Sequence, residues 1–313
     1  MIFIDNFPFV VYNDVCSKTL DYTSYRISER KHIMDIYYLA LYFFVYGFLG
    51  WCTEVAFAAC KEHRFVNRGF LNGPICPIYG VGVTAVVALL DPFRENIVLL
   101  YILSTVLVTV LEGLTGWAMD KIFHNKWWDY SDMPCNIGGY VCLLFSLIWG
   151  VACVVVMKFI HPLIHDILTF IPYRLGLILL VISVAALFID LYVTASTIFR
   201  FNRRLAGMEK IAAEMHDISD KIGQEIYENT IYAMELQETS KQKMEETAED
   251  MKEKTQEISE EIRTQIAQLR THYKRLDTRP DLVSRRLLNA FPHMESRNAK
   301  EQLNKVKEKW IKK

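Results

Sequence analysis

The sequence predicts an all-α protein: a polytopic membrane bundle of about five transmembrane helices, followed by a long coiled-coil-like helical tail. Three observations predict this class. Apolar windows of about 20 residues recur between residues 36 and 199, and a helix needs this length to cross a bilayer core about 30 Å thick. Charged residues become dense after residue 200. Beyond that step, apolar residues recur at heptad spacing, which is typical of helices that pair through one stripe.

The first element in chain order is a set of four clear membrane-spanning windows. Each is long enough and almost free of charge: Ile36–Ala59, Asn96–Met119, Tyr140–Ile160 and Leu175–Phe199. The rival class, a soluble bundle of buried helices, rarely contains so many windows of this length with aromatic and basic flanks. We therefore expect lipid to be the solvent of this region.

The second span in order differs from the others because its first half contains Asn72-Gly73-Pro74 and Pro77. The window covers Phe70–Leu90. Proline removes a backbone donor, and in lipid every backbone polar group must find a partner within the protein. We expect an irregular or re-entrant start that neighbouring helices bury, with helix from about Tyr79.

The composition divides the chain into four predicted parts: an N-terminal extramembrane segment (1–34), a transmembrane domain (35–200), a long charged coiled-coil helix (201–278) and a short basic helical C-terminal segment (279–313). The seven cysteines include no C-x-x-C pair and mostly lie in or beside apolar runs. We therefore predict no disulfide framework and no metal site.

Ionisable residues within the spans are the strongest signal of function, because each costs about 2.5–3.5 kcal/mol at a helix centre. Glu54 and Glu112 lie near the ends of odd-numbered spans and so approach the same membrane face, whereas Asp190 lies nearer mid-span without an obvious cationic partner. We expect Asp190 to face a cavity or to be protonated. The predicted polar intramembrane cluster, a candidate substrate site, comprises Glu54, Asn67, Arg68, Asn72, Glu112, Asp129, Asn136 and Asp190.

Two interpretations of this cluster stay open at the level of sequence. It is either a substrate or ion site, or a structural network that holds bent backbone in place, since a carboxylate–arginine pair serves both roles. We expect Glu54 and Glu112 to pair with Arg68 or Arg64. The nearby aromatic residues fit an interfacial belt better than a binding platform: Trp51, Trp127, Trp128 and Tyr130.

No residue pattern indicates an enzyme. His161 and His165 stand four apart, a spacing that holds metals on some helices, but Pro162 favours a loop or a helix start there, so no metal is predicted. The serines of the spans have no neighbouring histidine, and no G-x-x-x-x-G-K-[ST] motif is present. We predict no catalytic residue and no cofactor, and the question of enzymatic activity stays open.

The tail is predicted to be one long amphipathic helix. Its apolar seam runs through Met208, Ile211, Met215, Ile218, Ile222, Met244, Met251, Ile258, Ile262, Ile266, Leu269, Tyr273 and Leu276. The stretch Glu228–Lys243 keeps the heptad pattern poorly, so we expect a break or a stutter there. Residues 205–261 have a net charge of -10 and residues 262–313 a net charge of +9. These blocks favour an antiparallel fold-back or contact with anionic lipid, and pairing between two copies is the alternative.

Two prolines, Pro280 and Pro292, interrupt helix near the end of the tail. They bound a predicted short helix, Asp281–Ala290, and a last helix is expected from about Glu295. Nucleic-acid binding by this basic end is not favoured, because the segment lacks a recognisable binding module.

The membrane region also contains an ordered series of motifs: Gly47-Phe48-Leu49-Gly50-Trp51 with Glu54, the run N-R-G-F-L-N-G-P-I-C-P-I-Y-G over 67–80, Leu111-Glu112, Trp127-Trp128-Asp129-Tyr130-Ser131, Asn136, and Trp149-Gly150. Over about residues 36–200 these motifs resemble the bacterial family called putative ABC-transporter type IV. Arg279–Leu288 with Phe291-Pro292 resembles an extension found in some members. Where the family usually has N-x-x-G-R, this chain has Asn136-Ile137-Gly138-Gly139-Tyr140.

The resemblance implies a permease-like transport component that works with a separate ATPase subunit. A membrane scaffold or sensor that recruits partners through the tail, and a membrane-embedded enzyme acting on a lipid head group, are the alternatives. We expect a multi-pass protein of the cytoplasmic membrane with a cytoplasmic tail. Lys and Arg divide seven against eight between the two membrane faces, so the positive-inside rule does not choose the orientation.

Overall fold

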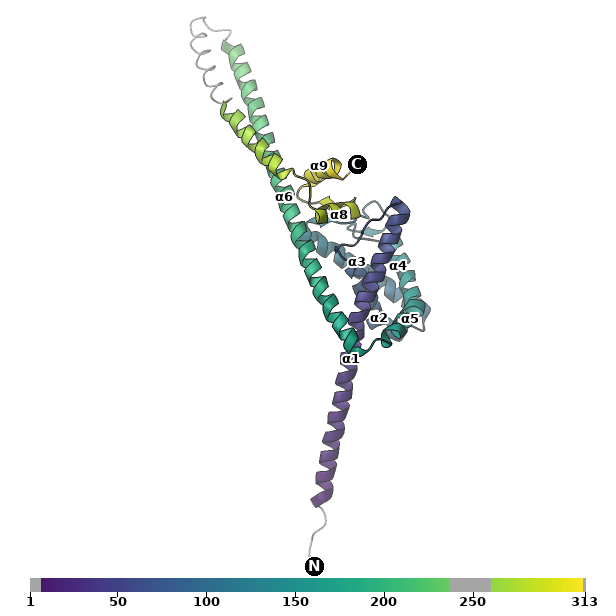
Figure 1. Cartoon of the computed structure of the whole chain (residues 1–313). Coiled ribbons are helices and arrows are strands. Elements are labelled where there is room, and N and C mark those ends of the chain that lie inside the picture. Colours follow the sequence, from purple (N-terminus) through teal and green to yellow (C-terminus); the bar gives the residue numbers. More distant parts are fainter. Residues whose placement is uncertain (1–6, 237–259, 312–313) are drawn as a thin grey trace, which may run out of the picture. The chain divides into compact units, whose positions relative to one another are not determined.

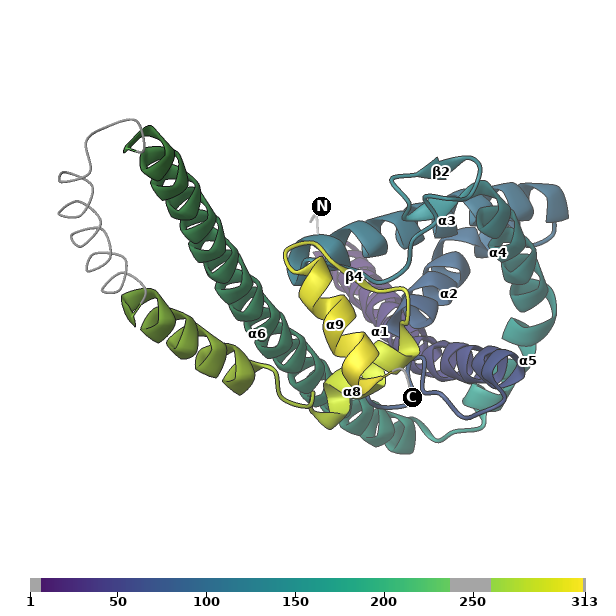
Figure 2. The same ribbon diagram turned by 90° about the horizontal axis from the view of Figure 1, so that it is seen from above.

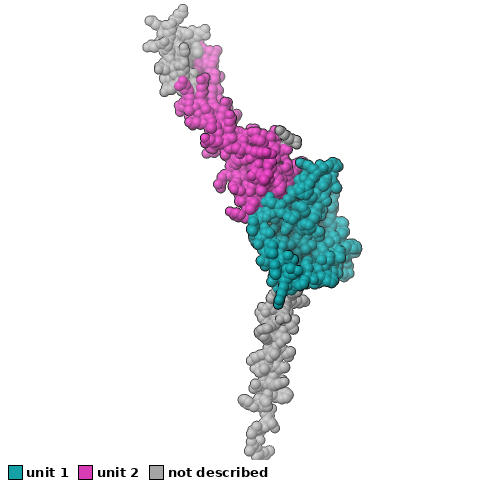
Figure 3. All heavy atoms as spheres, viewed as in Figure 1, with its two compact units in different colours: residues 1–115, 130–191 teal, residues 116–129, 192–313 magenta. Residues whose placement is uncertain are grey.

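The computed structural model describes residues 7–236 and 260–311. Its contacts divide the chain into two compact units, each described here by itself (Figure 3). Unit 1 contains residues 1–115 and 130–191, and unit 2 contains residues 116–129 and 192–313.

Four helical stretches are long and apolar enough to cross a membrane (Figure 1). They are Asp35–Glu62, Ile97–Phe123, Leu143–Thr169 and Tyr173–Ile231. The first belongs to α1 (Phe7–Glu62), and the second is α3 (Ile97–Phe123). The third joins α4 (Leu143–Val155), a π-helical turn (Val156–Ile160) and α5 (His161–Thr169). The fourth belongs to α6 (Tyr173–Leu236). The protein is therefore a multi-pass, all-α membrane protein, and the predicted fold class is confirmed.

The second span has the irregular start that its prolines predict. Residues 63–76 form no helix, and α2 (Pro77–Leu90) begins two residues before the expected Tyr79. At about 1.5 Å per residue, the 14 residues of α2 reach roughly 21 Å. This length is short of a bilayer core of about 30 Å, so α2 alone does not reach across one.

The helices of unit 1 alternate in direction around an aromatic core. The core gathers the early part of the first span (Asp35–Glu62 of α1), the end of α2, the start of α3 and the end of the α4–α5 span, and its members include Tyr42, Tyr46, Leu90, Leu100 and Leu168. Because helix starts meet helix ends there, α2 and the α4–α5 span run opposite to α1 and α3. The start of α6 lies beside the start of the first span, since the Tyr37 and Tyr173 rings are 4.9 Å apart.

Three glycines allow the helices of unit 1 to approach closely. A Cβ on Gly50 would lie 2.4 Å from the Tyr79 side chain, and one on Gly80 would lie 2.6 Å from the Phe43 carbonyl oxygen. A Cβ on Gly150 would lie 1.9 Å from Thr105 Oγ1, where α4 meets α3. Helix interfaces in membranes are enriched in such small residues for this reason.

A short hairpin lies between α3 and α4. Strand β2 (Asn136–Ile137) pairs with β3 (Val141–Cys142) in antiparallel register. Gly138 and Gly139 turn the chain with φ of 61° and 72°, a region that glycine enters without the steric cost of a side chain.

In unit 2, the tail folds back on itself. A helix over residues 260–276 runs back along the outer part of α6 (Figure 2). A Cβ on Gly207 would lie 3.1 Å from Leu276, and the Arg204 guanidinium donates to the Leu276 and Thr278 carbonyls. The fold-back that the charge blocks favour is therefore present. The seam residues Met244, Met251 and Ile258, and the predicted break from residue 237 onward, lie outside the described residues.

The C-terminal segment of unit 2 differs in part from the prediction. Helix α8 (Leu282–Ala290) begins as expected, with the Asp281 carboxylate accepting from Ser284 N at 2.8 Å. The last helix, α9 (Lys300–Trp310), does not begin at Glu295. Instead strand β4 (Glu295–Ser296) pairs with β1 (Asn125–Lys126), and Arg297 forms a 2.7 Å ion pair with Asp120. These long-range partners, rather than local propensity, decide the conformation there.

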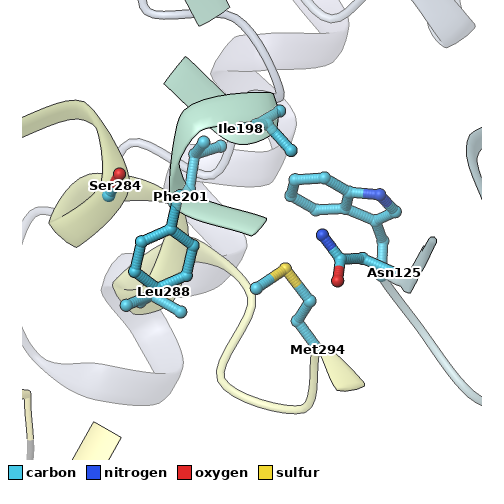
Figure 4. A pocket seen from close by; sticks show the side chains of 8 residues that line it. Asn125, Ile198, Phe201, Ser284, Leu288 and Met294 are labelled. Carbon is cyan, nitrogen blue, oxygen red and sulfur yellow. The ribbon is translucent and has the colours of Figure 1, made fainter. Parts of the chain in front are cut away.

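A small cavity lies among core side chains of unit 2 (Figure 4). It measures about 10 Å³ and lies between Asn125, Ile198, Phe201, Leu288 and Met294. A space of this size holds at most one water molecule. The cavity is therefore a packing defect and not a ligand site.

Candidate functional site

The polar site of unit 1 is centred on Glu54, near the end of α1. The Arg68 guanidinium lies 3.4 Å from its Oε2, and the Tyr79 hydroxyl donates to its Oε1 at 2.7 Å. The side chains of Glu54 and Arg68 are each 27% exposed, so the pair is accessible rather than sealed in the core. Three elements supply these groups: α1, the irregular segment 63–76 and α2.

The position of Tyr79 follows from the glycine opposite it. Gly50 precedes Glu54 by four residues on the same face of α1, and its missing side chain makes room for the Tyr79 ring. The Trp149 ring meets Tyr79 edge-on with 5.5 Å between ring centroids. The hydroxyl therefore has little freedom and points toward the carboxylate.

A second carboxylate, Glu112, lies on α3. The Tyr130 hydroxyl donates to its Oε1 at 3.4 Å, while its Oε2 is buried without a hydrogen-bond partner. Tyr130 lies in the connection between the spans. Burial raises the pKa of Tyr130, and the negative charges of Glu112 and then Glu54 raise it further. The Tyr130 hydroxyl therefore contacts Glu112 and lies within electrostatic range of Glu54.

Asp190, near mid-span on α6, contacts the irregular segment 63–76. Its carboxylate accepts from the backbone N–H groups of Asn72 and Gly73, at 3.1 and 2.7 Å, and from Asn72 Nδ2 at 2.8 Å. Amide groups of Asn72 and Gly73 therefore bind this intramembrane carboxylate. Hydrogen bonds to a carboxylate satisfy backbone donors that lipid cannot satisfy.

Asn67 completes the attachment of the irregular segment. Its Oδ1 accepts from Trp51 Nε1 at 2.8 Å, and its Nδ2 donates to the Asn72 carbonyl at 2.9 Å. Trp51 therefore serves as a hydrogen-bond donor to the bent backbone, beyond the belt role that its position predicts. Asn67, Asn72 and Asp190 are therefore the members of the predicted cluster that hydrogen-bond to one another within and around the irregular segment.

Several predicted residues lie elsewhere. Asn136 bonds within its own turn, to the Ser131 and Met133 carbonyls. Asp129 belongs to unit 2 and pairs with Lys126 at 2.7 Å. Arg64 pairs with Glu62 at 2.8 Å on the surface.

Trp127, in the connection after α3, is not the interfacial aromatic residue that its sequence position predicts. Trp127 is only 4% exposed and packs edge-on against Phe291 within unit 2, and Trp128 is half-buried. Trp127 is thus a core residue of unit 2. The sequence does not single out Tyr79 as a site residue. The signal that could have found it is the motif Pro77-Ile78-Tyr79-Gly80, in which one hydroxyl follows a proline that starts a helix.

Within the described ranges, no group of three or more His, Cys, Asp or Glu residues is arranged to hold a metal ion. The centre formed by Glu54, Arg68, Tyr79, Glu112 and Tyr130, called here the polar centre, instead offers hydrogen-bond acceptors, donors and one fixed positive charge. Such a set can bind a polar or charged solute, or can exchange protons with it.

Residues 41–195 match the family model described as Putative ABC-transporter type IV. The membrane region of this chain is thus similar to that family. The family region includes all five residues of the polar centre and also Asp190. No match was found among curated proteins or among solved structures. The chain is thus a multi-pass membrane protein whose membrane region is similar to a transporter-type family.

Proposed function

We propose that the chain is a permease-like transport component and that the polar centre is its substrate site. The observation that supports this proposal most strongly is the imbalance of charge there. Arg68 neutralises Glu54, whereas Glu112 has no cationic partner among the described residues and one of its buried oxygens is unpartnered. An intramembrane carboxylate in this state is costly unless it serves a ligand.

The same imbalance suggests the class of substrate. A centre with two carboxylates and one arginine favours a small solute that carries a positive charge. Tyr79 and Tyr130 donate to the carboxylates, so they would orient those acceptors toward such a solute. A structural pair alone would need neither the second carboxylate nor the second hydroxyl.

The test uses the full chain in proteoliposomes with rubidium ion, choline and ethanolamine as probes. At least one probe is expected to stabilise the protein against thermal unfolding and to cross the membrane. Glu112→Gln and Glu54→Gln are expected to lower that flux at least tenfold, and Arg68→Ala to alter it. Glu62→Gln, in a surface pair at the end of the same helix, is the matched control. Flux that all three variants leave unchanged would contradict the proposal.

Partners and orientation form part of the proposal. The family name suggests a separate ATPase subunit, which should co-purify with the tagged full-length chain from its native host. We place the protein in the cytoplasmic membrane with the tail in the cytoplasm, because a long, charged helical tail is common there. Homo-oligomerisation would then depend on seam positions left free by the fold-back.

A second candidate, a membrane scaffold, is supported by the construction of unit 2. Its C-terminal segment is tied to the connection after α3 by the β1–β4 pair and by the ion pair of Arg297 with Asp120. If recruitment is the main role, truncation after Arg204 should abolish function while the membrane region still folds. Retained function after that truncation would favour the permease.

A further inference from the structure

A second group of titratable side chains lies in unit 1, in the half of the first span that precedes the polar centre. The Tyr46 hydroxyl and His161 Nδ1 are 2.9 Å apart, and the Tyr42 hydroxyl and His165 Nδ1 are 2.5 Å apart. Tyr46 and His161 are buried, at 3% and 7% exposure, whereas His165 is exposed. Each histidine of α5 therefore has its own tyrosine on α1.

The rings form one continuous group. Tyr42 meets the His161 ring edge-on at 4.8 Å between centroids, and the His161 and His165 centroids are 6.3 Å apart. Tyr42 and Tyr46 are also neighbours, at 6.3 Å. The group thus leads from the exposed His165 to the buried His161.

The backbone is shaped to present these histidines. The π-helical turn Val156–Ile160 directly precedes His161. A π turn inserts one residue into a helix and so rotates everything after it by about 100°, given 3.6 residues per turn. Such turns are rare and are frequent at functional sites. Here the turn lies one residue before the only buried histidine of the membrane spans in the described part of the chain.

From this geometry we infer that His161 and His165, with Tyr46 and Tyr42, form a proton-binding site within the membrane region. A tyrosine hydroxyl donates to Nδ1 of a neutral imidazole. When Nδ1 takes up a proton, the same hydroxyl oxygen accepts from the new N–H, so the hydrogen bond reverses and is not lost. No other bond changes. A buried histidine without such a partner would leave the added N–H unsatisfied.

The surrounding charges limit the site to a single proton. Two imidazolium rings with centroids 6.3 Å apart would repel each other. The charged and titratable groups around His161 from other elements are Asp91 and Arg94, which follow α2 and have opposite signs. On α1 the neighbour is Tyr38, whose ring lies beside His165. The groups on their own helix are Lys158, which pairs with Glu95, and Asp166.

The site is aligned with the polar centre along α1. Tyr42, Tyr46, Gly50 and Glu54 follow one another at intervals of four, so they form one ridge that winds slowly around the helix. Over 12 residues this row extends about 18 Å along the helix. The proton site and the polar centre therefore occupy opposite halves of the first span, joined by the glycine against which Tyr79 packs.

The test follows the protonation of each imidazole by nitrogen NMR in the full-length protein, labelled at histidine and held in lipid nanodiscs. Between about pH 8 and pH 5, the range in which histidine normally titrates, His161 is expected to change from neutral to charged. The variants His161→Gln and His165→Gln assign the two signals. Removal of His165 is expected to move the midpoint of His161 to higher pH, since the like charge is gone.

The decisive variant is Tyr46→Phe, which keeps the ring and removes only the hydroxyl. It is expected to shift the midpoint of His161 to lower pH. Tyr38→Phe is the matched control, because the Tyr38 hydroxyl makes no hydrogen bond to the part of the chain that the structure describes. A His161 that stays neutral throughout the range, or that titrates identically in Tyr46→Phe, would overturn the inference. The measurement needs no flux, so it stands or falls separately from the transport proposal.

Discussion

At the scale of single residues, Asp190 shows how an intramembrane charge can be structural. Its carboxylate accepts three hydrogen bonds from Asn72 and Gly73, two of them from backbone N–H groups. Without this acceptor, those donors would lose their partner in a half-buried segment of the membrane region. Each unsatisfied donor costs about 1–3 kcal/mol. The stability of the irregular segment 63–76 therefore depends on one side chain of α6.

We predict that Asp190→Ala lowers the free energy of unfolding by about 2–5 kcal/mol, because it removes one charged acceptor and leaves several donors without a partner. Thermal unfolding of the purified protein in detergent measures this loss. Ser196→Ala is the control, since that hydroxyl on the same helix bonds only to the Val193 carbonyl one turn earlier. Equal melting temperatures for the two variants would show that Asp190 does not hold the segment.

The role of Asp190 could not be predicted from the sequence. Sequence reasoning looked for a cationic partner, but the actual partners are amide groups 118 and 117 residues away. Every residue except proline has a backbone N–H, so the sequence does not show which of these groups a side chain binds. By contrast, the sequence does predict a pair between Glu54 and an arginine, Arg68 or Arg64. A carboxylate and an arginine in a medium of low dielectric have few other partners.

At the scale of the helices, the contact between α1 and α2 determines where Tyr79 points. This contact depends on Gly50, where a Cβ would lie 2.4 Å from Tyr79 Cβ and Cγ. Those atoms cannot move without moving α2 itself. Gly82, also on α2, differs because a Cβ there would meet no atom within 4 Å.

We therefore predict opposite effects for two chemically identical substitutions. Gly50→Ala should force the helices apart, cost about 1–3 kcal/mol of stability and weaken the hydrogen bond of Tyr79 to Glu54. Gly82→Ala should be neutral or stabilising by up to about 1 kcal/mol, since alanine favours helix more than glycine does. Melting temperatures of the two variants, measured together, check this. A neutral Gly50→Ala would mean that α1 and α2 are not in close contact.

The sequence predicts some elements better than others. Apolar length locates the long spans, and Asn72-Gly73-Pro74 with Pro77 predicts the irregular start of the second crossing. The π-helical turn before His161 could not be foreseen, because Val156–Ile160 looks like any apolar helix. Pro162 marks a helix start correctly, yet the sequence does not show that a π turn, and not a loop, comes before it.

At the scale of the whole molecule, the number of crossings decides where the two ends of the chain lie. Unit 1 contains α1, the crossing completed by α2, α3, the α4–α5 span and the first part of α6, and their directions alternate. The start of α6 lies beside the start of the first span, as the contact of Tyr173 with Tyr37 shows. An odd number of crossings follows, because α6 then runs in the same direction as α1.

We predict that the N-terminal segment 1–34 and the tail face opposite sides of the bilayer, with the tail in the cytoplasm. Cysteine-free variants carrying either Asp35→Cys or Leu282→Cys test this, since both positions are exposed. A membrane-impermeant maleimide should label the first in intact cells and the second only after permeabilisation. Labelling of both from the same side would contradict the odd number of crossings. A reversed pattern would keep the crossings but place the tail outside, where a cytoplasmic ATPase subunit could not reach it.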